Sequence, residues 1–169
     1  MNALRDFHTG AEPPCDGQPC EQWLSYLTSY KVLLGNLSND VSAVACLLAK
    51  AYLEARHDLP PFEILSKPQG AAGHDVDVRT TGGERIVGEV KTTIPYNGPD
   101  FGASQDKEVR KDFDKLAAAR ADFKYFFVTD QRAFAAIKHK FLPFSAGVIL
   151  VKLPEGEMET HSGPVSYAS

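Results

Sequence analysis

The sequence predicts an α/β fold in which a mixed β-sheet is flanked by helices. Segments whose apolar residues recur every three or four positions stand beside segments of strict polar and apolar alternation. Prolines and glycines separate these segments, and the predicted order is two helices, three strands, a helix, a strand, a short helix and a strand. With 169 residues, of which 43% are hydrophobic and 24% charged, the chain suits a single globular core.

The N-terminal part predicts an arm followed by two helices. Residues 1–19 contain several prolines and no apolar period, so we expect a flexible arm. Apolar residues recur at three and four positions over 20–34, which predicts the first helix. The second helix should begin after residues 38–40, whose side chains offer N-cap oxygens, and end near His57 because two prolines follow.

Three strands are predicted next. The short run 62–66 is rich in apolar residues and predicts the first of them. Residues 74–80 and 85–92 both alternate strictly, and the sequence Thr-Gly-Gly at 81–83 lies between them. These two runs therefore predict a β-hairpin.

The second half predicts helices and strands in alternation. Residues 104–121 carry an apolar stripe and many charges on the other faces, which indicates an amphipathic helix. A strand at 124–129 is followed by Asp130, which should cap a short helix, and 146–153 is typical of a strand buried on both faces. The predicted organisation is an N-terminal arm, a single domain and a C-terminal tail, at 1–19, 20–153 and 154–169.

Charge and cysteine content limit the partners and the compartment. The 22 acidic and 18 basic residues give a net charge of −4, which argues against a nucleic-acid binder that depends on a general surplus of cations. Three cysteines cannot all pair within one chain and the histidines are scattered, so we expect reduced, structural cysteines and no zinc site. No stretch approaches the roughly 18 apolar residues of a membrane helix, and the N-terminus lacks the apolar centre of a signal peptide. We therefore expect a cytoplasmic protein without membrane contact.

The predicted hairpin carries a cluster of charges. If Gly83 takes the left-handed position that closes the loop, Asp75 faces Glu89 across the two strands. Side chains alternate along a strand, so Asp77 and Lys91 share the face of these two acids, and the apolar residues occupy the other face. Directly opposed carboxylates destabilise a hairpin, which indicates a cation between them. The other interpretation is a solvated, charged strand.

This pattern suits phosphodiester hydrolysis. Carboxylate oxygens and waters are the ligands that Mg²⁺ prefers. Lys91 stands two residues after Glu89, where its ammonium group can hold a nucleophilic water or stabilise negative charge on phosphorus.

The residues Gly73-x-Asp75, a hairpin and Glu89-x-Lys91 resemble the signature of the PD-(D/E)XK nuclease superfamily. This superfamily includes type II restriction endonucleases, Holliday-junction resolvases and mismatch-repair nicking enzymes. His74 stands where the signature has proline.

The resemblance implies which residues hold the metal. Asp75 and Glu89 would bind Mg²⁺, for which Mn²⁺ can substitute, and the carbonyl of Val90 would touch the metal. Asp77 is the alternative to Asp75. Lys91 would position or activate water.

The resemblance also implies a restriction-endonuclease-like fold, whose core order is helix, three strands, helix, strand, and residues 40–153 are predicted in that order. Many members add an acid from the preceding helix. Glu54 is the candidate here, with Glu63 on the first strand as the alternative. A solvated helix charge is the other interpretation of Glu54.

Polar residues begin the helix that follows the catalytic strand. We expect them either to hold the DNA backbone or to pair with neighbouring charges on the helix surface. They are Gln105, Lys107, Arg110 and Lys111.

The sequence thus predicts a Mg²⁺-dependent DNA endonuclease, with a type II restriction enzyme that cuts double-stranded DNA as the preferred class. A cut through both strands needs two active sites, so we expect a homodimer. The alternatives are a resolvase or repair nickase of the same fold, and a catalytically silent nucleic-acid-binding module. The first helix offers a candidate dimer interface, or a part of the core, at Trp23, Tyr26, Tyr30 and Leu33.

Overall fold

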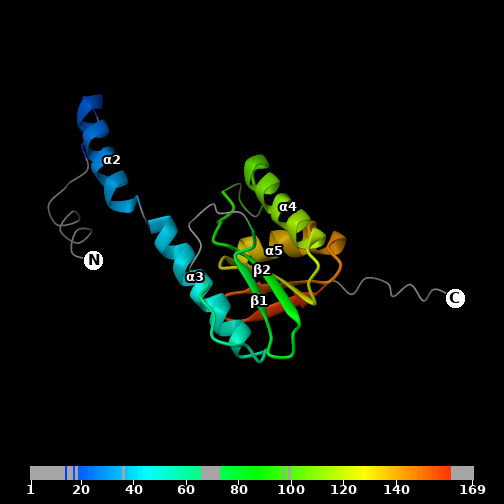
Figure 1. Cartoon of the computed structure of the whole chain (residues 1–169). Coiled ribbons are helices and arrows are strands. Elements are labelled where there is room, and N and C mark those ends of the chain that lie inside the picture. Colours follow the sequence, from blue (N-terminus) through cyan, green and yellow to red (C-terminus); the bar gives the residue numbers. More distant parts are fainter. Residues whose placement is uncertain are drawn as a thin grey trace. The chain divides into compact units, whose positions relative to one another are not determined.

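A computed structural model of the chain describes residues 14, 17, 19–35, 37–65, 73–96, 98 and 100–160. The chain divides into two compact units, Met1–Asp40 and Val41–Ser169, and this division falls inside the range predicted as one domain. Most of the predicted arm lies outside the described residues. The elements shown in Figure 1 are α2 (Cys20–Leu34), α3 (Leu37–Glu54), β1 (Val76–Arg79), β2 (Arg85–Lys91), α4 (Ala103–Ala118), β3 (Phe123–Val128), α5 (Gln131–Lys140), the 3₁₀-helix η1 (Leu142–Phe144), β4 (Val148–Lys152) and β5 (Glu157–Thr160).

The first two helices form where the apolar period predicted them. Helix α2 has the predicted bounds. Helix α3 begins slightly earlier than expected, at Leu37, and ends at Glu54, before the two prolines. Cys46 lies in α3 as a free thiol, and burial raises its pKa.

The prediction about membrane-spanning composition is wrong. The stretch Cys20–Glu54 is long and apolar enough to cross a membrane, with a mean hydropathy of 1.5 in one window of 18 residues, of which 12% is buried. Length and composition alone do not distinguish such a span from a helix of a soluble protein. The prediction failed because it looked for an uninterrupted apolar run. In Cys20–Glu54 a few polar residues are scattered among the apolar ones.

The second unit contains a five-stranded mixed sheet in the order β1-β2-β3-β4-β5. Strands β2, β3 and β4 are parallel, and β1 and β5 pair antiparallel at the two edges. Parallel neighbours need a crossover, which α4 supplies between β2 and β3 and α5 supplies between β3 and β4. The predicted α/β class with a mixed sheet is confirmed.

Helices cover both faces of the sheet (Figure 1). On one face, α4 and α5 pack on Val87, Phe126 and Leu150. On the other face, α3 packs on Val78 and Phe127. The charged face of the predicted hairpin is therefore partly covered, because α4 lies over β2.

Two local predictions differ from the structure. Residues 62–65 form no strand, and the carbonyl of Phe62 instead accepts a hydrogen bond from Lys50 Nζ at 2.7 Å. Glu63 is exposed in this segment. The region predicted as a C-terminal tail contains β5, which pairs with β4 although its side chains are mostly exposed. An edge strand of this kind lacks the apolar alternation that marks a buried strand.

Candidate active site at the open end of the hairpin

The hairpin has the predicted loop and register. Thr80 N–H donates to the Glu84 carbonyl at 2.8 Å, and Gly83 closes the loop with φ of 92°. Val78 pairs with Ile86 along the ladder. The ladder ends at the pair Val76 and Gly88, and Asp75 and Glu89 are the next residues at the open end of the hairpin.

Glu89 is buried beneath α4. Its side chain lies on the face that α4 covers, and only 3% of the residue is exposed. Lys115 Nζ of α4 lies 2.8 Å from Glu89 Oε1, and His74 Nδ1 lies 2.7 Å from the same oxygen. Burial raises the pKa of Glu89, the Lys115 ammonium lowers it, and the nearby charge of Asp75 raises it; the balance is a raised pKa. The site therefore holds a carboxylate whose charge is incompletely compensated.

The structure distinguishes between the two candidate aspartates. Asp75 Oδ2 accepts a hydrogen bond from the backbone N–H of Val90 at 2.8 Å, so this carboxylate is held beside the residue that follows Glu89. Asp77 pairs across the ladder with Val87, and its two oxygens bind the Arg85 guanidinium at 2.9 and 2.8 Å. The bidentate pair commits Asp77 to Arg85, whereas Asp75 is bound to the β2 backbone and its charge acts on Glu89.

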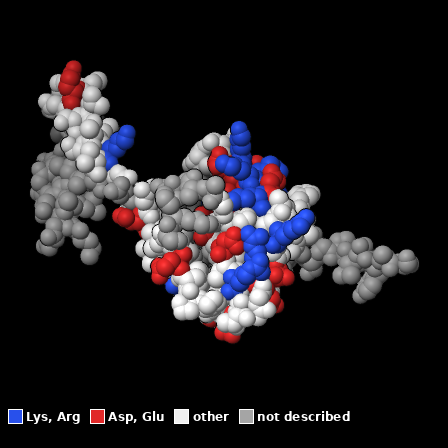
Figure 2. All heavy atoms as spheres, viewed as in Figure 1, with Lys and Arg blue, Asp and Glu red and all other residues white. Residues whose placement is uncertain are grey.

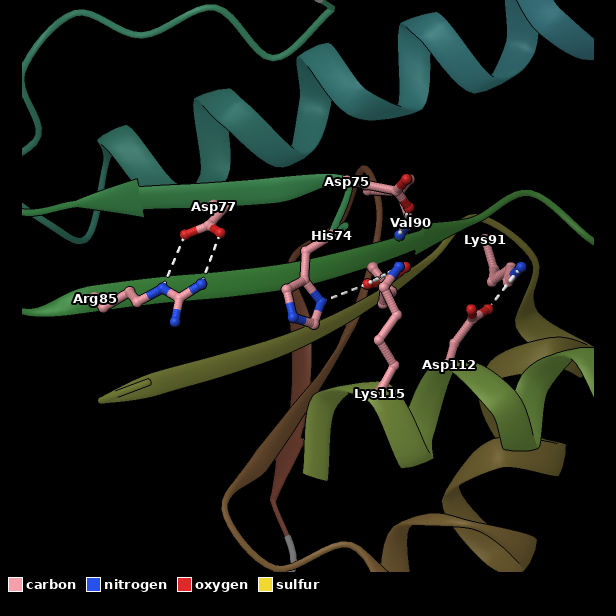
Figure 3. A network of polar contacts seen from close by, with 9 residues as sticks. His74, Asp75, Asp77, Arg85, Val90, Lys91, Asp112 and Lys115 are labelled. Atoms are coloured by element: carbon pink, nitrogen blue, oxygen red, sulfur yellow. Dashed lines mark hydrogen bonds and ion pairs between the residues drawn. The ribbon is translucent and has the colours of Figure 1, made fainter. Parts of the chain in front are cut away.

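Lys91 lies at the end of β2 and pairs with α4. Its Nζ is 2.6 Å from Asp112 Oδ2, and the Asp112 residue is buried. Figure 3 shows Asp112 and Lys115 both reaching from α4 toward the end of β2. The two residues are three positions apart and so share one face of the helix.

Sequence reasoning missed the contributions of Asp112, Lys115 and His74. A signal for Asp112 was present, because it falls within the buried stripe of α4 between Val109 and Leu116. A carboxylate at such a position needs a cationic partner. Lys115 and His74 gave no comparable signal, since their contact with Glu89 depends on how α4 packs on the sheet.

The structure does not bring Glu54 to this group. Its side chain is half exposed and lies 3.8 Å from Lys50, one turn earlier on α3. The end of α3 lies beside the hairpin loop, because Thr81 N–H donates to the Asp58 carbonyl at 2.9 Å. Asp75 precedes β1, at the opposite end of the hairpin.

The four polar residues predicted to hold DNA lie on α4 as expected. Gln105 has a structural role at the start of α4. Its Oε1 accepts a hydrogen bond from Gly102 N–H, which caps the helix, and its Nε2 donates to the Ile94 carbonyl. Arg110 lies 3.7 Å from Asp106 on the same helix. Lys107 and Lys111 are exposed. Figure 2 shows basic atoms gathered over α4 with acidic atoms among them.

The donor set can be tested for its fit to Mg²⁺. Among the described residues, no three His, Cys, Asp or Glu side chains form a group that could hold a metal ion. Mg²⁺ commonly takes only one or two carboxylates and completes its shell with water. Asp75 and Glu89 provide two carboxylates close enough for one to raise the pKa of the other. These residues fit a hydrated Mg²⁺ and do not form a dry, all-protein cage.

Comparisons with protein-family models, curated proteins and solved structures found no match to this chain.

Proposed function

We propose that this protein is a Mg²⁺-dependent endodeoxyribonuclease with a restriction-endonuclease-like fold. The observation that carries the proposal is that Asp75 is held on the backbone N–H of Val90 at 2.8 Å, next to Glu89, with Lys91 two residues after Glu89 on the same strand. Two acids and a lysine at the open end of one hairpin can bind a metal ion, orient water and stabilise negative charge, which serves phosphodiester hydrolysis.

In this proposal Asp75 and Glu89, with the carbonyl of Val90, would hold the metal ion. Bound Mg²⁺ supplies positive charge for the phosphate oxygens and makes a water more acidic. Lys91 orients the attacking water and stabilises negative charge on the phosphorus. The water oxygen would form a bond to phosphorus as the bond to the leaving oxygen breaks; the water would give up one proton to solvent, and the leaving oxygen would take up one proton from solvent.

The contacts of α4 support a role for this helix in arranging these groups. Asp112 fixes the position of the Lys91 ammonium, and Lys115 compensates the charge of Glu89. Both groups are positioning residues here, because they act on side chains of β2 and not on substrate. Exposed Lys107 and Lys111 on the same helix would contact the DNA backbone.

The preferred subclass is a type II restriction enzyme acting as a cytoplasmic homodimer on double-stranded DNA. A resolvase or nickase would use the same groups. A catalytically silent nucleic-acid-binding module is a second candidate, because both lysines of the site are already paired with carboxylates.

Incubation of supercoiled plasmid with the purified protein and Mg²⁺ or Mn²⁺ tests the proposal. Discrete linear bands indicate a restriction enzyme, and nicked circles indicate a nickase. Glu89→Gln and Lys91→Met should each abolish cleavage. Glu84→Gln is the matched control, since Glu84 is an exposed acid on the same hairpin. Absence of cleavage by folded wild-type protein with either metal would overturn the enzymatic proposal.

The metal ligand is tested separately. Asp75→Asn should lose cleavage, whereas Asp77→Asn should keep it, because Asp77 is bound to Arg85. The opposite result would assign the metal to Asp77.

A further inference from the structure

His74 is the residue at which this chain departs from the nuclease signature, and the proposed function gives it no role. It stands where the signature has proline. A proline side chain offers no hydrogen-bond donor, whereas a histidine ring nitrogen can donate. Figure 3 shows the His74 ring turned toward the middle of the polar network, where it meets Glu89.

The contact between His74 and Glu89 is covered from solvent. The His74 side chain is 11% exposed and that of Glu89 is 4% exposed. Gly73 precedes the histidine with φ of 106°, a conformation that glycine adopts readily and other residues rarely. The backbone therefore enters the hairpin through a turn that favours glycine, and the histidine ring lies against the buried acid.

Two donors share one oxygen of Glu89. His74 Nδ1 lies 2.7 Å from Oε1, and Lys115 Nζ lies 2.8 Å from the same atom. An ionised carboxylate only accepts hydrogen bonds, so Nδ1 is the donor in the pair with ionised Glu89. Each carboxylate oxygen has about two acceptor sites, and these two donors use those of Oε1. The other oxygen, Oε2, is the one that can take a metal ion.

The two donors differ in their effect on a bound cation. The ammonium group of Lys115 repels a divalent ion, whereas a neutral imidazole donates a hydrogen bond without adding charge. The last torsion of a glutamate side chain is broad and roughly two-fold, so one donor alone lets either oxygen turn toward it. A second donor from a different part of the chain fixes which oxygen remains for the metal.

We propose that His74 is a positioning residue for the metal ion, which holds Oε1 of Glu89 so that Oε2 is presented to the ion shared with Asp75. The proposal rests on the metal site of the proposed function and adds the oxygen that binds the ion and the residue that orients it. Hydrogen-bond partners of metal ligands typically change metal affinity about 10- to 100-fold. Loss of the His74 donor should therefore raise the dissociation constant for the ion by about this factor.

Binding of Mn²⁺ to the full chain tests the proposal without any nuclease reaction. The loss of the electron paramagnetic resonance signal of free Mn²⁺ gives the dissociation constant. His74→Ala should raise this constant about 10- to 100-fold. His74→Leu fills more of the space of the ring without a donor, so it should weaken binding to a similar extent. His74→Asn should keep most of the wild-type affinity, because its amide N–H stands at the same branch of the side chain as Nδ1.

His57→Ala is the matched control. His57 is a partly buried histidine of the same unit, and its Nε2 lies 2.8 Å from the Tyr125 hydroxyl. This variant loses a comparable hydrogen bond away from the metal site and should bind Mn²⁺ as the wild type does. Thermal unfolding followed by circular dichroism verifies that each variant is folded at the temperature of the titration.

The outcomes separate this proposal from the proposed function. Wild-type affinity in His74→Ala and His74→Leu, equal weakening in His74→Asn, or the same weakening in His57→Ala would overturn the role of His74 alone. Mn²⁺ binding that depends on His74 in a protein that cleaves no plasmid would support this role and overturn the nuclease. A folded wild type that binds no Mn²⁺ would overturn both.

Discussion

Replacement of Lys115 by Met tests the electrostatics of the site in the folded protein. The change removes the ammonium group that lies 2.8 Å from Glu89 Oε1 and keeps much of the apolar stem. Glu89 then remains buried, and His74 Nδ1 still lies 2.7 Å from the same oxygen. Because burial already raises the pKa of Glu89, the loss of this cation should destabilise the folded state.

The size of the effect follows from the burial of each partner. Removing one member of a fully buried ion pair costs about 3–5 kcal/mol. Lys115 has a side chain that is 32% exposed, and His74 still hydrogen-bonds Glu89, so we expect about 2 kcal/mol. For a chain of this length that corresponds to a fall in melting temperature of roughly 4–8 °C.

Magnesium should restore the lost stability. If Asp75 and Glu89 bind Mg²⁺, the ion replaces the missing cation, and free Mg²⁺ at about a hundred times its dissociation constant adds about 2.7 kcal/mol. Thermal unfolding of Lys115→Met, with and without Mg²⁺, measures both effects. Lys111→Met is the control, because Lys111 is exposed on the same helix and should change the melting temperature little. Unchanged stability of Lys115→Met, or equal Mg²⁺ responses in the Glu89→Gln/Lys115→Met double variant, would refute the reasoning.

Three further predictions concern stability. The raised pKa of Glu89 means that the folded state holds this proton more tightly than the unfolded state, so stability should fall as pH rises from about 4.5 through the raised pKa. Glu89→Gln should remove this fall in the free energy of unfolding with pH, measured by urea titration at several pH values. Burial raises the pKa of Tyr125 to about 12, so unfolded tyrosine ionises first and stability should fall between about pH 10 and 12; Tyr125→Phe should flatten this alkaline loss. Asp130 accepts hydrogen bonds from Arg132 N–H and Ala133 N–H at 2.9 and 3.1 Å, so Asp130→Ala should cost about 1 kcal/mol in chemical denaturation while Asp130→Asn costs less.

The hairpin could be predicted from the sequence because its determinants are local. Successive side chains of a strand point to opposite faces, which assigns each residue to a face, and the Thr-Gly-Gly loop sets the register once Gly83 takes its left-handed conformation. The pairing of Val78 with Ile86 follows from these two facts alone. Asp130 as a helix cap was predictable for the same reason, since its partners are two and three residues away.

The environment of Glu89 could not be predicted, because it depends on contacts between distant segments. The alternation of side chains along the strands shows that Glu89 shares a face with the other acids of the hairpin. It does not show which element covers that face. Helix α4 buries it through the packing of Phe113 on Phe126, whose rings stack 4.4 Å apart. The missing strand at 62–65 is a similar case, since its apolar residues pack without joining the ladder.

The charges around the site explain how an acidic protein would accept DNA. Asp75, Glu89 and Asp112 bring three carboxylates, while Lys91 and Lys115 bring two ammonium groups, which leaves a formal charge of −1 on these five side chains. One Mg²⁺ changes this to one positive charge. The sign of the local potential therefore reverses on metal binding, so we expect that phosphate is repelled from the metal-free site and attracted to the loaded one. On the proposed function, the net charge of −4 would weaken general DNA binding and make binding at this site depend on the metal.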